Sequence, residues 1–259
     1  MLLFCLKAIL AGFSIAMAGL CYSLIRWLNE TKIKCNSIFN FIGSIVFSLG
    51  LVVICKFKLY LFTGKVGFIF TGCNSKVEDE GGEDGEEERN GNDQEDEEGS
   101  STTSTTSPPP PPPYITYTHL SLSLIINLLA SFSIGILFAI IFKSTTLPTT
   151  TYLLLTQSKI TLSPNIPEYL FHTLLQSIYC GLFVHAAVIS FKFNPLFTVF
   201  FISAFVYNGF QHCIANAFYF GLTYYRHLSI NMLINELVVI VGNVVGTIPL
   251  QLLMNHYHL

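Results

Sequence analysis

Apolar residues recur along the chain in long runs that are separated by short polar stretches and by one long polar insertion. Each run approaches the ~20 residues with which an α-helix crosses about 30 Å of hydrocarbon. The pattern predicts six membrane spans at 3–27, 38–72, 118–143, 168–191, 195–225 and 231–254. The second and fifth runs are too long and too interrupted to be single straight helices. We therefore predict an all-α polytopic membrane protein with six transmembrane helices, of which helices two and five are broken.

The interruptions are the stretches "LFTG" at 61–64 and "NGFQH" at 208–212. A helix can break inside a bilayer only where its freed backbone groups face protein or water. Because each break falls in the second span of a triplet, the pattern favours an inverted three-plus-three repeat whose broken helices meet near the midplane and form a permeation path. A second interpretation stays open, in which both stretches are short loops between separate helices.

A polar insertion at 74–114 divides the chain into a first membrane segment, 1–73, and a second one, 115–259. The insertion is acidic, then rich in Ser and Thr, and it ends with six prolines at 108–113. Charge repulsion and proline stiffness both oppose a packed core, so we predict a disordered cytosolic insertion. Its proline run is either a plain linker or a ligand for a cytosolic partner.

Composition supports a membrane protein and changes how the net charge is interpreted. Hydrophobic residues make up 51% of the chain and charged residues 11%, which is under half of the usual share of about 25%. The segment 77–98 holds 13 of the 16 acidic residues and a single basic one, so the remainder has 12 basic and 3 acidic residues. This excess favours anions near the mouths of a pore, although lysines at helix ends also reach the headgroups for structural reasons. We expect an integral, multi-pass protein of the plasma membrane.

Two histidines of the predicted spans need separate interpretation, His212 beside a break and His185 in an uninterrupted run. A membrane histidine is either a buried imidazole that is hydrogen-bonded to a neighbour or a proton-exchanging group of a pore. The break favours the second role for His212, and its absence favours the first for His185. The seven cysteines show no metal spacing, and no nucleophile–base pair is visible. We predict no enzyme, metal site or nucleic-acid partner.

Several motifs together resemble one known family. "GFQHCIANAFYF" at 209–220 is similar to the fifth-helix signature of the formate/nitrite transporter family, and "LFTG" at 61–64 resembles its omega-loop motif. Further similar segments are "FSLGL" at 47–51, "NLLA" at 127–130 and "NELVVIVGNVVG" at 235–246. The resemblance implies an aquaporin-like protomer of six helices, a homopentamer with one pore per protomer, and no cofactor.

The resemblance also implies two apolar constrictions along the pore. The outer constriction would be formed by Phe47, Leu51 and Phe205. The inner constriction would be formed by Leu61 and Phe62.

The polar pore residues implied by the resemblance centre on His212, with Thr63 beside it. Asn216 and Asn243 would be structural or pore-proximal amides, and Lys159 would be the cation of the outer vestibule. The chain departs from the family pattern at Gln211, where a glutamate is usual, at Gly181, and at Lys56 and Lys58, near a break that is usually uncharged.

The resemblance implies that the protein is a channel or transporter for small monovalent anions or their weak acids, such as formate, lactate, acetate, nitrite or hydrosulfide. Desolvation in an apolar neck favours the neutral acid, so we expect proton-coupled passage, with the proton supplied by His212 or by water. A water or glycerol pore is disfavoured because the only Asn-Pro pair, at 194–195, is followed by leucine. The remaining alternative is a non-transporting scaffold that binds a cytosolic partner through the insertion.

Overall fold

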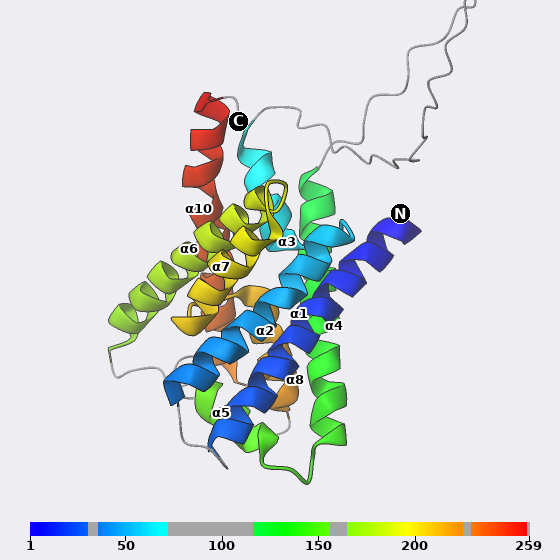
Figure 1. Cartoon of the computed structure of the whole chain (residues 1–259), viewed down its shortest axis with the longest axis vertical. Coiled ribbons are helices and arrows are strands. Elements are labelled where there is room, and N and C mark those ends of the chain that lie inside the picture. Colours follow the sequence, from blue (N-terminus) through cyan, green and yellow to red (C-terminus); the bar gives the residue numbers. More distant parts are fainter. Residues whose placement is uncertain (31–35, 72–115, 156–164, 225–228, 258–259) are drawn as a thin grey trace, which may run out of the picture. The chain divides into compact units, whose positions relative to one another are not determined.

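The computed structural model describes residues 1–30, 36–71, 116–155, 165–224 and 229–257. The described residues contain helices and connecting turns and no strand, so the all-α prediction is confirmed. In chain order (Figure 1) the elements are α1 (Leu2–Leu28), α2 (Asn36–Lys56), α3 (Phe62–Lys65), the 3-10 helix η2 (Val66–Thr71), α4 (Tyr117–Ile141), α5 (Leu147–Leu155), α6 (Ile166–Ser190), α7 (Pro195–Tyr207), α8 (Cys213–Leu222) and α10 (Ile230–Tyr257).

Within the described residues, α1, α2, α4, α6 and α10 are each long and apolar enough to cross a membrane, whereas α7 and α8 are apolar but shorter. The predicted second span consists of α2, a stretch of non-helical backbone, and then α3, which η2 follows directly. The predicted fifth span consists of α7 and α8, which are likewise separated by non-helical residues. Helix α5 was not predicted.

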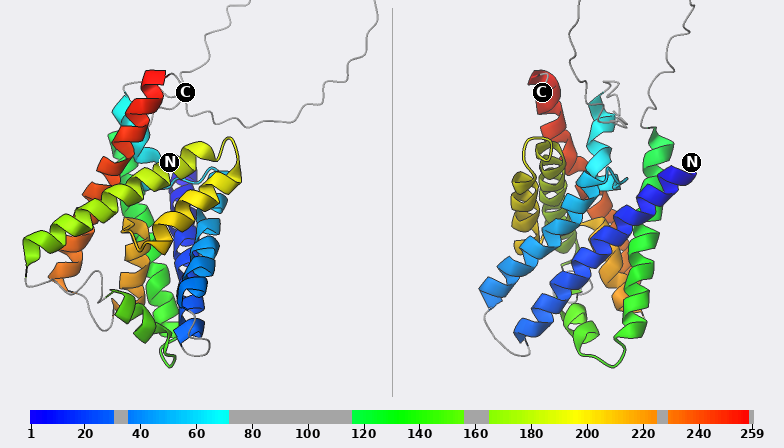
Figure 2. Two further views of the ribbon diagram at one scale, coloured as in Figure 1. Left: turned by 60° about the vertical axis from the view of Figure 1, so that its left-hand side comes forward. Right: turned by 45° about the vertical axis from the view of Figure 1, so that its right-hand side comes forward.

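The long helices pack in neighbouring pairs. Helix α10 packs along α6, α4 contacts both α8 and α1, and α2 lies between α1 and α7. Figures 1 and 2 show that α1 begins, α4 begins and α10 ends toward the same end of this bundle, while α5 lies at the other end. Outward-facing residues such as Leu129 and Ile140 are about 60% exposed, which suits helices that are surrounded by lipid.

Two close helix contacts depend on glycine. A Cβ atom at Gly181 of α6 would lie 2.2 Å from the carbonyl oxygen of Asn243 on α10. A Cβ atom at Gly12 of α1 would lie 2.6 Å from the carbonyl oxygen of Asn127 on α4. The missing side chains therefore let each pair of backbones approach closely, and both contacts bring an asparagine toward the bundle interior.

Local sequence sets where two of the helices begin. The Thr116 hydroxyl accepts a hydrogen bond from the His119 N–H at 3.3 Å at the start of α4. The Asn194 side-chain oxygen accepts from the Leu196 N–H at 2.9 Å, and Pro195 occupies the first position of α7. Such caps satisfy amide groups that a helix leaves without a partner.

The insertion at 74–114, with its predicted disorder and predicted cytosolic partner, lies outside the described residues. So does Lys159, the predicted cation of the outer vestibule. The interpretations of these two features remain predictions.

Candidate functional site

The first break is held together by Asn127, which lies on α4 and is fully buried. Its Oδ1 accepts from the Phe62 N–H at 2.8 Å, and its Nδ2 donates to the Tyr60 carbonyl at 3.0 Å. The same Nδ2 donates to the Ala8 carbonyl of α1 at 2.7 Å. One amide thus satisfies the backbone groups that the break releases and ties them to two neighbouring helices.

The second break has the same arrangement around Asn243 of α10, which is also fully buried. Its Oδ1 accepts from the Cys213 N–H at 3.0 Å, and its Nδ2 donates to the Gln211 carbonyl at 2.8 Å. Nδ2 also donates to the Ser177 carbonyl of α6 at 2.9 Å. The amide of Asn243 therefore provides partners for two backbone groups that the non-helical segment releases, which helps such a segment to persist inside the protein.

His212 is the N-cap of α8 and is 3% exposed. Its Nδ1 accepts from the Ala215 N–H at 3.2 Å, and its Nε2 lies 3.0 Å from Thr63 Oγ1. Its ring stacks on Phe205, with centroids 6.0 Å apart and an interplanar angle of 23°. Because an amide N–H can only donate, Nδ1 is the acceptor, and the neutral imidazole carries its proton on Nε2, toward Thr63.

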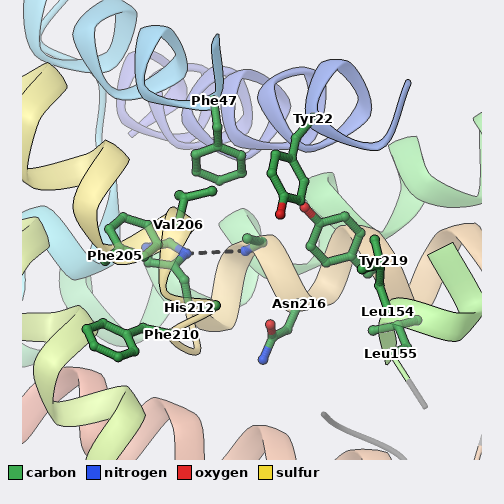
Figure 3. A pocket seen from close by; sticks show the side chains of 12 residues that line it. Tyr22, Phe47, Leu154, Leu155, Phe205, Val206, Phe210, His212, Asn216 and Tyr219 are labelled. Carbon is green, nitrogen blue, oxygen red and sulfur yellow. Dashed lines mark hydrogen bonds between the residues drawn. The ribbon is translucent and has the colours of Figure 1, made fainter. Parts of the chain in front are cut away.

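A cavity of about 110 Å³ lies beside this histidine. Figure 3 shows it between Phe47 and Tyr22 on one side and Phe205, His212 and Asn216 on the other. The rings of Phe47 and Phe205 meet edge to face at 6.2 Å between centroids. The lining is mainly apolar, with an imidazole and an amide among its polar groups, and the volume suits a solute of a few non-hydrogen atoms.

Comparison with known proteins places this architecture in a family. The family model described as "Formate/nitrite transporter" matches residues 114–257, which is more than half of the chain. The chain belongs to the formate/nitrite transporter family. A search of curated protein sequences returns no match.

Two solved structures share the fold of this family member. One, a "Pentameric formate channel with formate bound", has a TM-score of 0.66 and 17% sequence identity, over 98% of this chain and 94% of the other. The second, an "FNT family ion channel", has a TM-score of 0.66 and 18% identity, over 100% of this chain and 90% of the other. The match to the family model and the apolar helices together make the chain an integral, multi-pass membrane protein of a transporter family, and not an enzyme.

Four predicted site residues of this formate/nitrite transporter family member line the cavity. They are Phe47, Phe205, His212 and Asn216. Thr63 contacts His212 without being part of the lining, and Asn243 holds the second break. The structure thus brings these six residues together, while their roles in transport stay predictions.

The remaining predicted apolar residues are buried but lie outside the cavity lining. Leu51 and Leu61 are each 2% exposed and Phe62 is 5% exposed. Leu61 is the N-cap of α3 and therefore occupies the place in the first break that His212 has in the second. The predicted inner constriction at Leu61 and Phe62 stays a prediction.

Sequence reasoning missed several residues around the cavity. Tyr22 and Tyr219 line it, as do Leu154 and Leu155 of the unpredicted helix α5. It also missed the hydrogen bond that Asn216 donates to Glu236 of α10. The signal for Glu236 was available, because a carboxylate seven residues before Asn243 in an apolar run is costly in a membrane.

His185 lies away from this cavity and is fully buried. Its Nε2 is 2.8 Å from Gln251 Oε1, and its ring meets Phe68 edge to face at 5.2 Å. A Cβ atom at Gly67 would lie 2.4 Å from the ring. These contacts match the expectation of a hydrogen-bonded structural histidine that packs η2 against α6 and α10.

Proposed function

We propose that this protein is a channel or transporter for small monovalent anions and their weak acids, with formate, lactate, acetate, nitrite and hydrosulfide as candidate substrates. The single observation that carries the proposal is the placement of His212. Its imidazole lines a small, mainly apolar cavity next to the Phe47–Phe205 contact, and Nε2 of the same ring is within hydrogen-bond distance of the Thr63 hydroxyl.

The physical argument favours passage as the neutral acid. An isolated charge at the bilayer centre costs about 2.5–3.5 kcal/mol even on lenient insertion scales. Desolvation raises the pKa of a weak acid that enters the cavity, so the anion binds a proton there more readily than in water. The anion and one proton combine on entry, and the acid releases that proton again on the far side.

His212 can take part in this exchange because its hydrogen bonds define where a proton is added. The neutral ring directs Nε2–H toward Thr63 and uses Nδ1 to cap α8. A second proton on Nδ1 would displace the hydrogen bond from the Ala215 N–H. This loss favours transfer of the proton from the cationic ring to the anion. Water in the cavity is the alternative donor, and the sign of the pH dependence is the same for both.

We also infer an inverted three-plus-three, aquaporin-like repeat. The support is a correspondence between the breaks: the left-handed backbone at Lys58 and Gly209, and the buried amides of Asn127 and Asn243, occupy equivalent places. The structurally similar pentameric formate channel supports a homopentamer here as well. The plasma membrane is the proposed location, and imaging of the tagged protein at the cell surface checks it.

Uptake into proteoliposomes tests the transport function. The purified chain is reconstituted, and the five candidate substrates are supplied one at a time over a series of external pH values. We expect uptake of at least one weak acid, rising as the external pH falls. No uptake of any candidate would overturn the transport proposal, whereas uptake that is independent of pH would overturn only protonated passage.

A further inference from the structure

Glu236 is a carboxylate on the inner side of α10. It lies one turn from the buried residues Met232 and Val239 and about two turns before Asn243, so helical spacing places all four on one face. An ionisable side chain inside a membrane helix is costly and generally has a functional reason. The cavity side of the molecule therefore has a second group that can exchange a proton, besides His212.

A chain of side-chain hydrogen bonds connects this carboxylate to the cavity wall. Asn216 Nδ2 carries two hydrogens; one points to Glu236 Oε2 at 3.3 Å and the other to Gln211 Oε1 at 3.4 Å. Gln211 Nε2 in turn donates to Gln176 Oε1 of α6 at 3.3 Å. Asn216 and Gln211 are fully buried, and Asn216 lines the cavity. Figure 3 shows Asn216 in the cavity lining, so its amide connects the Glu236 carboxyl group to the cavity.

We propose that Glu236 is a specificity-determining residue, whose protonation state sets how readily an anion enters the cavity. This role rests on the proposed transport function. An ionised Glu236 places a negative charge beside the cavity and disfavours anions relative to neutral acids. A protonated Glu236 removes this charge, so the cavity accepts anions more easily as the pH falls.

Other titratable side chains lie on the elements that pack against α10. On α6 they are Glu168, Tyr169, His172, Tyr179, Cys180 and His185, and on α8 they are Cys213 and Tyr219. Neither α6, α8, η2 nor α10 contains a lysine or an arginine. Glu168 and His172 are exposed at the start of α6, 3.9 Å apart. Glu168 therefore serves as a matched carboxylate that is remote from the hydrogen-bonded chain.

The first test is formate uptake by proteoliposomes of the full-length protein, measured from about pH 5 to about pH 8. We expect Glu236→Gln to raise uptake at neutral pH by roughly threefold to tenfold, because a like charge beside the cavity is lost. Its pH profile becomes flatter than that of the wild type. Glu168→Gln keeps the wild-type profile, and the shorter carboxylate in Glu236→Asp retains the wild-type pH dependence.

The second test moves the carboxyl group to the other acceptor of the same amide. In the double variant Glu236→Gln with Gln211→Glu, Asn216 again donates to one carboxylate and one amide oxygen. We expect this swap to restore the wild-type pH profile, even where Glu236→Gln alone yields too little folded protein. A Glu236→Gln or swap profile that contradicts these expectations, while the wild type transports, overturns the role of Glu236 alone. Lack of uptake by the wild type overturns the transport function together with this role.

Discussion

The two breaks share a backbone design and differ in the residue at its centre. In the first, the Leu59 N–H donates to the Ile54 carbonyl, and Leu61 caps α3. In the second, the Phe210 N–H donates to the Phe205 carbonyl in the same five-residue pattern, and His212 caps α8. A buried asparagine of a neighbouring helix holds each break in place.

The difference between Leu61 and His212 shows which property of a break is structural and which is chemical. Because the same backbone forms around a leucine and around a histidine, the imidazole is not needed to make a break. A leucine cap can only exclude water and ions, whereas a histidine cap can also bind a proton. The first break therefore acts as a natural control for the second.

The largest expected effect comes from removing the shared element. Asn127→Leu and Asn243→Leu each remove the side-chain partner of three backbone groups, and each lost partner of a buried group costs about 1–3 kcal/mol. We expect both variants to lose several kcal/mol of stability, seen as a lower melting temperature in detergent. Asn208→Ala is the control and stays near the wild type, because this asparagine of the second break is exposed and its side chain donates only an exposed hydrogen bond, to the Ala204 carbonyl. A wild-type melting curve for either leucine variant would contradict the role assigned to these amides.

The next effect tests the imidazole itself. His212→Phe keeps an aromatic ring against Phe205 but removes proton exchange, and loss of a proton-transfer group slows a reaction by about 10²–10⁴-fold. We expect formate uptake in proteoliposomes to fall by about a hundredfold or more. Adding Leu61→His to this variant does not restore uptake, since the first cap lies outside the cavity lining. His185→Phe leaves the pH profile unchanged, and equal losses from both histidines would remove the special role of His212.

A smaller effect is expected at the partner of His212. Thr63→Val keeps the shape of the side chain but removes its contact with Nε2, which is worth about 1 kcal/mol. Uptake at a fixed pH then decreases by about fivefold, and Thr63→Ser recovers most of it because the hydroxyl group returns. Identical rates for the valine and serine variants would show that the hydroxyl does not orient the ring.

The smallest effect concerns the left-handed residue of each break. Gly209 has a φ of 72° with nothing within 4 Å of an added Cβ, and Lys58 has a φ of 48°. Gly209→Ala is therefore expected to cost about 1 kcal/mol, and Lys58→Gly to gain up to about 1 kcal/mol. Opposite shifts of the melting temperature would support the equivalence of the two positions, and shifts of the same sign would argue against it.

Sequence reasoning located features that one segment determines by itself. The Gly209 turn and the "LFTG" stretch mark where helix formation stops. The sequence also shows that His212 follows Gly209 closely. Periodicity does not reveal which helices become neighbours, so the connection from Gln176 to Glu236 could not be predicted. Helix α5 was missed because its 9 residues are too few for a search based on membrane-spanning lengths.

The hydrogen bonds of the first break also set an order of events during biosynthesis. The Phe62 N–H obtains its partner from Asn127, 65 residues later in the chain. The Cys213 N–H obtains its partner from Asn243 after only 30 residues. The hydrogen bond of the first break can therefore form only after the ribosome has synthesised the insertion at 74–114 and the residues up to Asn127. The hydrogen bond of the second break can form after a much shorter stretch of synthesis.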